Sequence, residues 1–183
     1  MKNNRLILNQ KQIDLTIQRL CYQLIENHNS FENSVILGLQ PRGVFLAQKI
    51  VNHLQGIFPD SNIKFGVLDA TFFRDDFRRR DNPIIPNKTK IDFIIEDKKV
   101  ILIDDVLYTG RTIRAGLDAM LAYGRPSLVE LLVLIDRRLS RHLPIEPNYV
   151  GTTVDSVISE RVEVQWEEID GKNEVVLKEN IKA

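Results

Sequence analysis

The stretch Val100-Ile-Leu-Ile-Asp-Asp-Val-Leu-Tyr-Thr-Gly-Arg-Thr112 decides how the rest of the chain is interpreted. Residues 99–106 are an almost unbroken apolar run that carries two aspartates at its end. A strand that is apolar on both faces lies inside a sheet covered by helices on each side. Residues 110–123 have apolar side chains at helical spacing, and Gly124 and Pro126 end that helix. The stretch therefore predicts a buried parallel strand, a turn and a helix.

Further segments repeat this alternation of strands and helices. Asn9 followed by Gln12 resembles a capping box, and apolar residues at spacings of three and four follow it. The predicted helices are 10–28 and 44–54, and the predicted strands are 34–39, 62–71, 128–135, 149–154, 161–169 and 174–177. We find no repeat, low-complexity tract or linker in the sequence. Residues 1–183 are therefore predicted to form one α/β domain, with helices packed over a largely parallel sheet.

Composition and charge narrow the class of protein. The 183 residues are 43% hydrophobic and 27% charged, close to the averages for globular proteins. Lys plus Arg and Asp plus Glu both number 25, so no overall basic excess attracts nucleic acid or an anionic membrane. The single cysteine, Cys21, fits a reducing compartment, and the sequence has neither a signal-peptide core nor an apolar run of ~20 residues. We expect a cytoplasmic protein without a membrane partner.

The end of the central strand is the first candidate site. Open parallel sheets bind ligands beyond the carboxyl ends of their strands, which is where Asp104 and Asp105 lie. The turn after them leads into a helix, whose free N–H groups and dipole favour a phosphate. Gly110 allows close backbone approach, and the hydroxyls of Thr109 and Thr112 can donate to phosphate oxygens. The two carboxylates suit a ribose diol and, directly or through water, a magnesium ion.

A simpler interpretation is that the two aspartates only end the strand and cap the helix. Taken alone, a strand, an acidic residue, a turn and a helix are a common sequence of features. Other phosphate-binding motifs fit badly, because the chain contains neither Gly-x-x-x-x-Gly-Lys-Ser/Thr nor Gly-x-Gly-x-x-Gly after a strand. A P-loop nucleotidase and a dinucleotide-binding fold are therefore disfavoured.

The segment Asp104-Asp-Val-Leu-Tyr-Thr-Gly-Arg-Thr112 resembles the phosphoribosyl-diphosphate (PRPP) motif of type I phosphoribosyltransferases. With Arg114-Ala-Gly-Leu-Asp118 and Gly124-Arg-Pro-Ser127 after it, the chain looks most like the PyrR family. Its members are uracil phosphoribosyltransferases that also regulate pyrimidine operons. The resemblance covers residues 7–180. It implies a central parallel sheet flanked by helices, a flexible loop and a small base-binding hood.

The resemblance also implies which residues touch the substrate. In the family, a Lys-Thr-Arg-Gly-like loop holds pyrophosphate, often through a strained peptide, and Arg42 matches its arginine. Gln40 and Pro41 depart from the usual residues of that loop. The residues expected to contact PRPP or UMP are Pro41, Arg42, Gly43, Asp104, Asp105, Val106, Leu107, Tyr108, Thr109, Gly110, Arg111 and Thr112. Asp104, Asp105, Arg42 and Arg74 are the expected catalytic residues, and the two aspartates hold magnesium through the ribose diol or water.

Residues 71–81 carry Arg74, Arg78, Arg79 and Arg80 among three aspartates. The plain interpretation is a solvated loop, which suits any single arginine. The family resemblance implies a mobile lid that closes over PRPP and excludes water. Arg74 belongs to the recurring Tyr/Phe-Arg-Asp-Asp element of the family and is the arginine expected to act.

The base-binding hood is where the chain departs from the family. Asp136 and Arg137 follow a central strand, and the resemblance places Arg137 and Val162 at the hood. The family commonly reads Asp-Arg-Gly-His-Arg-Glu-Leu-Pro here. This chain is one residue longer, so the loop histidine is missing or displaced to His142. Elsewhere, His28 and His53 are expected at the surface, and Trp166 is expected to serve in packing.

The resemblance implies that uracil and PRPP react to give UMP and diphosphate, with magnesium as cofactor. It also implies that a dimer binds pyrimidine-operon (pyr) leader mRNA in response to UMP, and that the chain forms a homodimer or larger homo-oligomer. Arg19 is retained on the first helix, whereas Gln18 and Tyr22 replace the usual Thr and His. Two alternatives stay open: a phosphoribosyltransferase for another base, such as hypoxanthine or guanine, and a mainly non-catalytic RNA-binding regulator.

Overall fold

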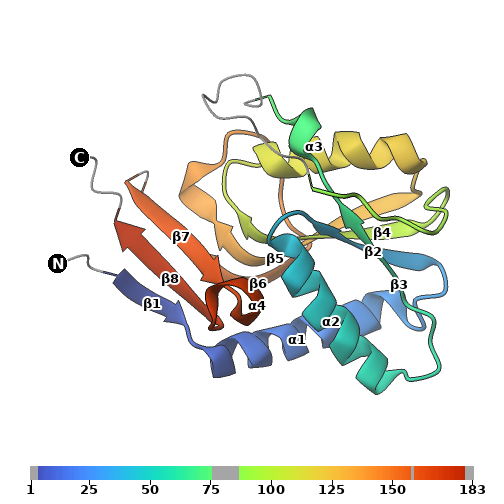
Figure 1. Ribbon diagram of the computed structural model, residues 1–183, viewed down its shortest axis with the longest axis horizontal. Coiled ribbons are helices and arrows are strands. Elements are labelled where there is room, and N and C mark those ends of the chain that lie inside the picture. The colour runs from blue at the N-terminus through green and yellow to red at the C-terminus, as the bar shows by residue number, and fades with distance from the viewer. Residues whose placement is uncertain (1–3, 76–86, 158, 180–183) are drawn as a thin grey trace.

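Two sheets of unequal size form the framework of the molecule (Figure 1). The structure is a computed structural model that describes residues 4–75, 87–157 and 159–179. The larger sheet has five parallel strands in the order β3-β2-β4-β5-β6. These strands are β2 (Ser34–Leu39), β3 (Lys64–Leu68), β4 (Lys99–Leu107), β5 (Leu128–Arg137) and β6 (Tyr149–Val154). The predicted parallel sheet is confirmed, and β4 is its middle strand.

Helices cover both faces of this sheet. On one face, Ile101 and Ile103 of β4 belong to the same core as the apolar sides of α1 (Gln10–His28) and α2 (Gly43–Ile57). On the other face, Val100 and Leu102 pack with α3 (Arg111–Met120). Alternate side chains of a strand point to opposite faces, so an unbroken apolar run is what two covered faces require. No helix among the described residues has both the length and the apolar character needed to cross a bilayer.

The smaller sheet is antiparallel and has the order β1-β8-β7. Together with the short helix α4 (Glu167–Asp170), its strands β1 (Asn4–Leu8), β7 (Glu160–Gln165) and β8 (Glu174–Glu179) form what we call the hood. Figure 1 shows β1 and β8, the first and last strands, side by side in this sheet. The prediction of one strand over residues 161–169 is wrong in its second half, where the chain turns into α4. Trp166 is fully buried, as expected of a packing residue.

The expected surface position of His28 is wrong. His28 is 7% exposed, with Nδ1 at 2.8 Å from Oγ of Ser34 and Nε2 at 2.8 Å from Oε2 of Glu130. It lies one helical turn after the buried Leu24, on the face of α1 that packs against the sheet. Burial lowers the pKa of His28. His53 is half-buried, so it is not a fully exposed residue either.

Candidate active site

The acidic pair lies deep in the molecule, close to the carboxyl end of β4. Asp104 is 7% exposed and Asp105 is 9% exposed, and the backbone N–H of Asp105 donates to Oδ1 of Asp104 at 2.9 Å. Burial, followed by the negative charge of Asp105, raises the pKa of Asp104 well above its usual range. Burial also raises the pKa of Asp105. Burying two adjacent carboxyl groups is costly, which marks this pair as a candidate functional site.

The turn after β4 has the expected form of a glycine turn into a helix. Gly110 has φ 88° and is the N-cap of α3. This left-handed conformation favours glycine. The backbone N–H of Arg111 points to Oγ1 of Thr109 at 3.4 Å, and that of Arg114 donates to the Gly110 carbonyl at 2.9 Å. The backbone N–H of Arg111 at the start of α3 therefore lies beside the hydroxyl of Thr109 in the turn.

A second turn, at residues 40–43, connects β2 to α2. The Gln40–Pro41 peptide bond is cis, and α2 begins at Gly43. A Cβ on Gly43 would lie 2.6 Å from the Ile103 carbonyl oxygen and 2.8 Å from Cα of Asp104. Real Cβ atoms do not approach backbone so closely, so only glycine fits here. The second turn is thus in direct contact with the central strand at the acidic pair.

Arg74 reaches the same region from the third segment that the sequence singled out. It is the residue after the 3-10 helix Thr71–Phe73, and its Nη1 donates to Oγ1 of Thr112 at 3.3 Å. Its charge opposes the rise in the pKa of Asp104. Arg111 pairs with Asp75, and Nη2 of Arg114 donates to the Phe73 carbonyl at 3.2 Å. Arg74 and Asp75, in the segment expected to form the lid, therefore contact the start of α3. Arg78, Arg79 and Arg80 lie outside the described residues.

Arg42 belongs to the second turn and contacts the hood. Its Nη1 donates to the Val164 carbonyl at 2.7 Å and to Oδ2 of Asp170 at 2.8 Å. The bond to Asp170 is the first cause of a raised Arg42 pKa, and the charge of Asp105 adds to it. The sequence analysis missed Val164 and Asp170, because no local pattern links residues more than a hundred positions apart.

Comparison with known proteins identifies the family. A family model described as a phosphoribosyl transferase domain matches residues 4–169. The bifunctional protein PyrR of Acetivibrio thermocellus is 44% identical over 171 residues, which cover 93% of this chain and 92% of that protein. This chain belongs to the PyrR family. The PyrR protein of Bacillus subtilis is 37% identical over 183 residues, covering 98% of this chain and 99% of that one.

Solved structures agree on the fold alone. A hypoxanthine phosphoribosyltransferase of Trypanosoma cruzi has a TM-score of 0.71 at 12% identity, with 96% of each chain covered. A hypoxanthine-guanine phosphoribosyltransferase of Bacillus anthracis has a TM-score of 0.70 at 16% identity. The superposed residues cover 95% of this chain and 96% of the chain of that enzyme. The predicted type I phosphoribosyltransferase fold is therefore confirmed.

The two residues expected at the PyrR base site are both buried. Arg137 is 4% exposed, and its Nε donates to Oγ of Ser156 at 2.7 Å while its Nη2 donates to the Glu160 carbonyl at 2.9 Å. Its guanidinium carbon lies 3.9 Å from the centre of the Tyr108 ring. Val162 is 6% exposed and packs in the core between hood and sheet. Arg137 thus joins the hood to the turn after β4.

The loop that differs from other PyrR sequences packs against the same turn. The backbone N–H of His142 donates to the Thr109 carbonyl at 3.0 Å, and Nη1 of Arg141 donates to the Tyr108 carbonyl at 2.7 Å. The side chain of His142 is exposed. His142 therefore contributes its backbone to the turn.

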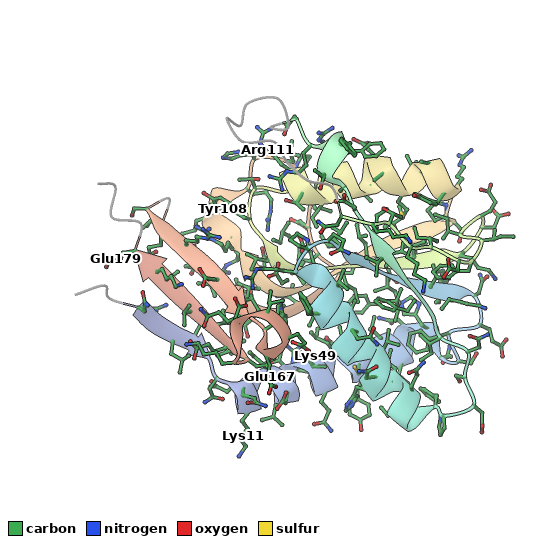
Figure 2. The ribbon with its side chains drawn as sticks, viewed as in Figure 1. Lys11, Lys49, Tyr108, Arg111, Glu167 and Glu179 are labelled. Carbon is green, nitrogen blue, oxygen red and sulfur yellow. The ribbon has the colours of Figure 1, made fainter. Side chains whose placement is uncertain are left out.

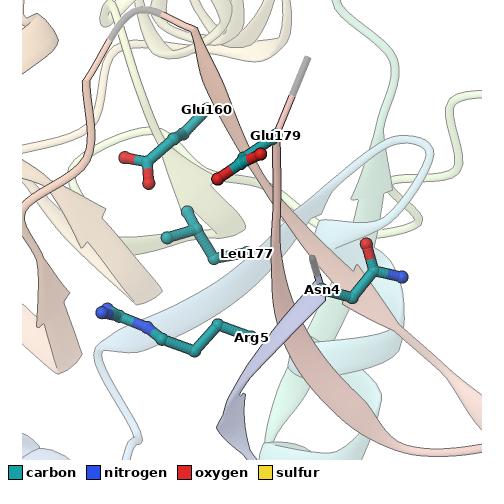
Figure 3. A pocket seen from close by; sticks show the side chains of 5 residues that line it. All are labelled: Asn4, Arg5, Glu160, Leu177 and Glu179. Atoms are coloured by element: carbon teal, nitrogen blue, oxygen red, sulfur yellow. The ribbon is translucent and has the colours of Figure 1, made fainter. Parts of the chain in front are cut away.

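A separate hollow of about 430 Å³ opens at the free end of the hood (Figure 3). Its lining is Asn4, Arg5, Glu160, Leu177 and Glu179. Glu160 turns its side chain toward this hollow, whereas its carbonyl oxygen accepts from Arg137. The hollow therefore lies next to Glu160, the hood residue whose carbonyl accepts from Arg137. Asp104 and Asp105 are not part of its lining.

Arg19 is exposed on α1, and its Nη2 donates to the carbonyl oxygens of Val150 at 3.0 Å and Gly151 at 2.6 Å. Gln18 and Tyr22 are exposed on the same helix. The PyrR residue expected to bind RNA is thus anchored to β6, while its neighbours face solvent.

The acidic pair has the donor chemistry that suits magnesium. Among the described residues, no group of three or more His, Cys, Asp or Glu side chains could enclose an ion. Mg²⁺ usually binds one or two carboxylates together with substrate oxygens and water, and it prefers oxygen ligands. Asp104 and Asp105 supply two such carboxylates, whose pKa values are raised first of all by burial. These residues fit an ion that arrives with a diphosphate substrate.

Proposed function

We propose that this chain is a uracil phosphoribosyltransferase, which converts uracil and PRPP into UMP and diphosphate. The observation that carries the proposal is the contact of Gly43 with Asp104. This contact places the turn at residues 40–43, which suits diphosphate, beside the two carboxylates, which suit the ribose diol. The strand that carries these carboxylates leads directly into the turn at residues 108–112, which suits the 5′-phosphate. One PRPP molecule offers these three groups in that arrangement.

In this reaction a uracil nitrogen displaces diphosphate from the anomeric carbon of ribose. As the bond to diphosphate breaks, positive charge develops on the sugar, and the carboxylates of Asp104 and Asp105 stabilise it. Arg42 and Arg74 bind the departing negative charge. Asp104 and Asp105 would hold magnesium, which would supply positive charge against the departing diphosphate. The turn 108–112 holds the 5′-phosphate, so the protein acts by orientation and electrostatics without a covalent nucleophile.

The most informative assay compares PRPP-dependent turnover with uracil, hypoxanthine, guanine and orotate. Uracil is expected to give the highest kcat/KM by at least about a hundredfold, because buried polar groups arranged for one base are left unpaired by another. A higher kcat/KM with hypoxanthine or guanine would replace the proposal with a purine enzyme. No turnover with any base would leave only the non-catalytic regulator.

We also propose that the chain regulates pyrimidine genes by binding pyr leader mRNA in response to UMP. The family supports this role, and the retained Arg19 is the residue expected to contact RNA. Filter binding should show UMP-enhanced affinity that falls as salt rises. The variant Arg19→Gln should weaken binding, whereas Lys11→Gln, the same change of charge elsewhere on α1, should not. Absence of UMP-enhanced binding would leave only the enzyme.

Assembly and location complete the proposal. Leu15 and Tyr22 lie two turns apart on α1 and are 56% and 51% exposed, which suits contact with a second copy. We expect a homodimer or larger homo-oligomer in the cytoplasm. Sedimentation of the purified chain should therefore give a mass at least twice that of the monomer.

A further inference from the structure

Helix α4 of the hood is docked onto α2 by two ion pairs. Arg42 at the start of α2 pairs with Asp170 at 2.8 Å, and Lys49 pairs with Glu168 at 2.8 Å. Arg42 and Lys49 are seven residues apart, so they project from the same side of the helix. The Nζ of Lys49 also lies 5.7 Å from the centre of the Trp166 ring. Figure 2 shows Lys49 beside Glu167, where the two helices meet.

Of these two pairs, only the one formed by Asp170 reaches the turn beside the acidic pair. Oδ2 of Asp170 accepts from Nη1 of Arg42 at 2.8 Å, and Oδ1 accepts from Nη2 at 3.2 Å. Oδ2 also accepts from the backbone N–H of Trp166 at 2.9 Å, which fixes the carboxylate. With the Val164 carbonyl at 2.7 Å, the guanidinium plane is held from two directions.

The bonds of Arg42 leave part of its binding capacity unused. A guanidinium has five N–H donors, and three are taken by Asp170 and Val164. The remaining two, Nε–H and one N–H of Nη2, have no partner among residues 4–75, 87–157 and 159–179. Two donors on one rigid plane can bind two oxygens of a phosphate group.

We propose that Asp170 is a positioning residue of the diphosphate site, acting through Arg42. This inference rests on the proposed function. Asp170 holds the guanidinium of Arg42 against the hood. The two unused N–H groups are then available to donate hydrogen bonds to the diphosphate. Without Asp170, the carboxylates that still attract the guanidinium include Asp105, which together with Glu163 contributes to the raised Arg42 pKa. Arg42 would then compete with ribose and magnesium for the acidic pair.

The test compares Asp170→Asn with Glu168→Gln, which removes the neighbouring ion pair of the same two helices. Asp170→Asn should raise the KM for PRPP and the inhibition constant of inorganic diphosphate about tenfold. The KM for uracil should change less than about twofold. Glu168→Gln should leave all three constants within about twofold of the wild type. Equal losses in both variants would mean that Asp170 only docks the hood, and would overturn the proposal.

A double variant shows whether Asp170 acts through Arg42. In the Arg42→Gln background, adding Asp170→Asn should have no further effect on diphosphate inhibition, because the group being positioned is gone. An undiminished tenfold effect in that background would contradict the inference. Calorimetric binding of magnesium diphosphate to the same variants needs no turnover. It therefore tests the role of Asp170 even if the wild type does not convert uracil.

Discussion

Replacing Asp104 by Asn is expected to reduce UMP formation by at least about a hundredfold while raising the melting temperature by a few degrees. Activity should fall because the neutral amide neither stabilises a cationic ribose nor holds magnesium. Stability should rise because the native chain no longer carries a buried carboxyl group beside Asp105. The same substitution at Asp105 should reduce turnover in the same way.

The gain in stability expected of Asp104→Asn should grow as the pH rises. Burial and Asp105 raise the pKa of Asp104 in the folded chain above its usual value of 3.8. Between that value and the raised one, the folded chain binds more protons than the unfolded chain, so the free energy of unfolding falls as pH rises. Asp104→Asn removes the carboxyl group that titrates, and with it this fall in the free energy of unfolding. Its advantage in melting temperature should therefore be small near pH 4 and grow toward neutral pH.

The matched control is Asp118→Asn, because Asp118 is an exposed carboxylate of α3 that pairs with Arg114. Its effects on turnover and melting temperature should both be slight. Thermal scans at several pH values and initial-rate assays supply the measurements. Near-wild-type turnover in both Asp104→Asn and Asp105→Asn would exclude the acidic pair from the reaction.

Gly43→Ala is expected to lower turnover by about ten- to a hundredfold and the free energy of unfolding by about 1–3 kcal/mol. The new methyl group would meet the Ile103 carbonyl at 2.6 Å and Cα of Asp104 at 2.8 Å. Both neighbours are backbone atoms of the central strand, so the turn at residues 40–43 has to move. That movement would separate Arg42 from the acidic pair.

Gly56→Ala is the control for this change. Gly56 lies in the same helix, and a Cβ there would meet nothing within 4 Å. Alanine favours a helix over glycine by about 1 kcal/mol, so this variant should be slightly more stable and fully active. Denaturant unfolding and PRPP kinetics of the two variants should diverge. If Gly43→Ala behaves like Gly56→Ala, the close contact of Gly43 with the central strand is not required.

The features predicted from the sequence are those set by local chemistry. The apolar run before Asp104 predicted the central strand, and the capping box of Asn9 and Gln12 is present at the start of α1. The glycine turn at residue 110 also followed from residue type. These signals occupy a few consecutive positions, where hydrophobic period and backbone preference decide the structure.

The features that were missed depend on contacts between distant segments. Nothing near Asn4 indicates that it pairs with Lys178, and nothing near Asp170 indicates that it binds Arg42. His28 was placed at the surface because its partner Glu130 lies in another element. The strand predicted for residues 161–169 ran through α4, because four helical residues are too few to show a helical period.

The pairing of β1 with β8 gives the protein a particular order of assembly during synthesis. Asn4 can meet Lys178 only after residue 178 has left the ribosome. The five parallel strands and the turns beside Asp104 are complete by Val154 and need no residue of β8. A nascent chain can therefore form the five parallel strands first, whereas the hood waits for β8. Synthesis of β8 is therefore the step that allows the hood sheet to form.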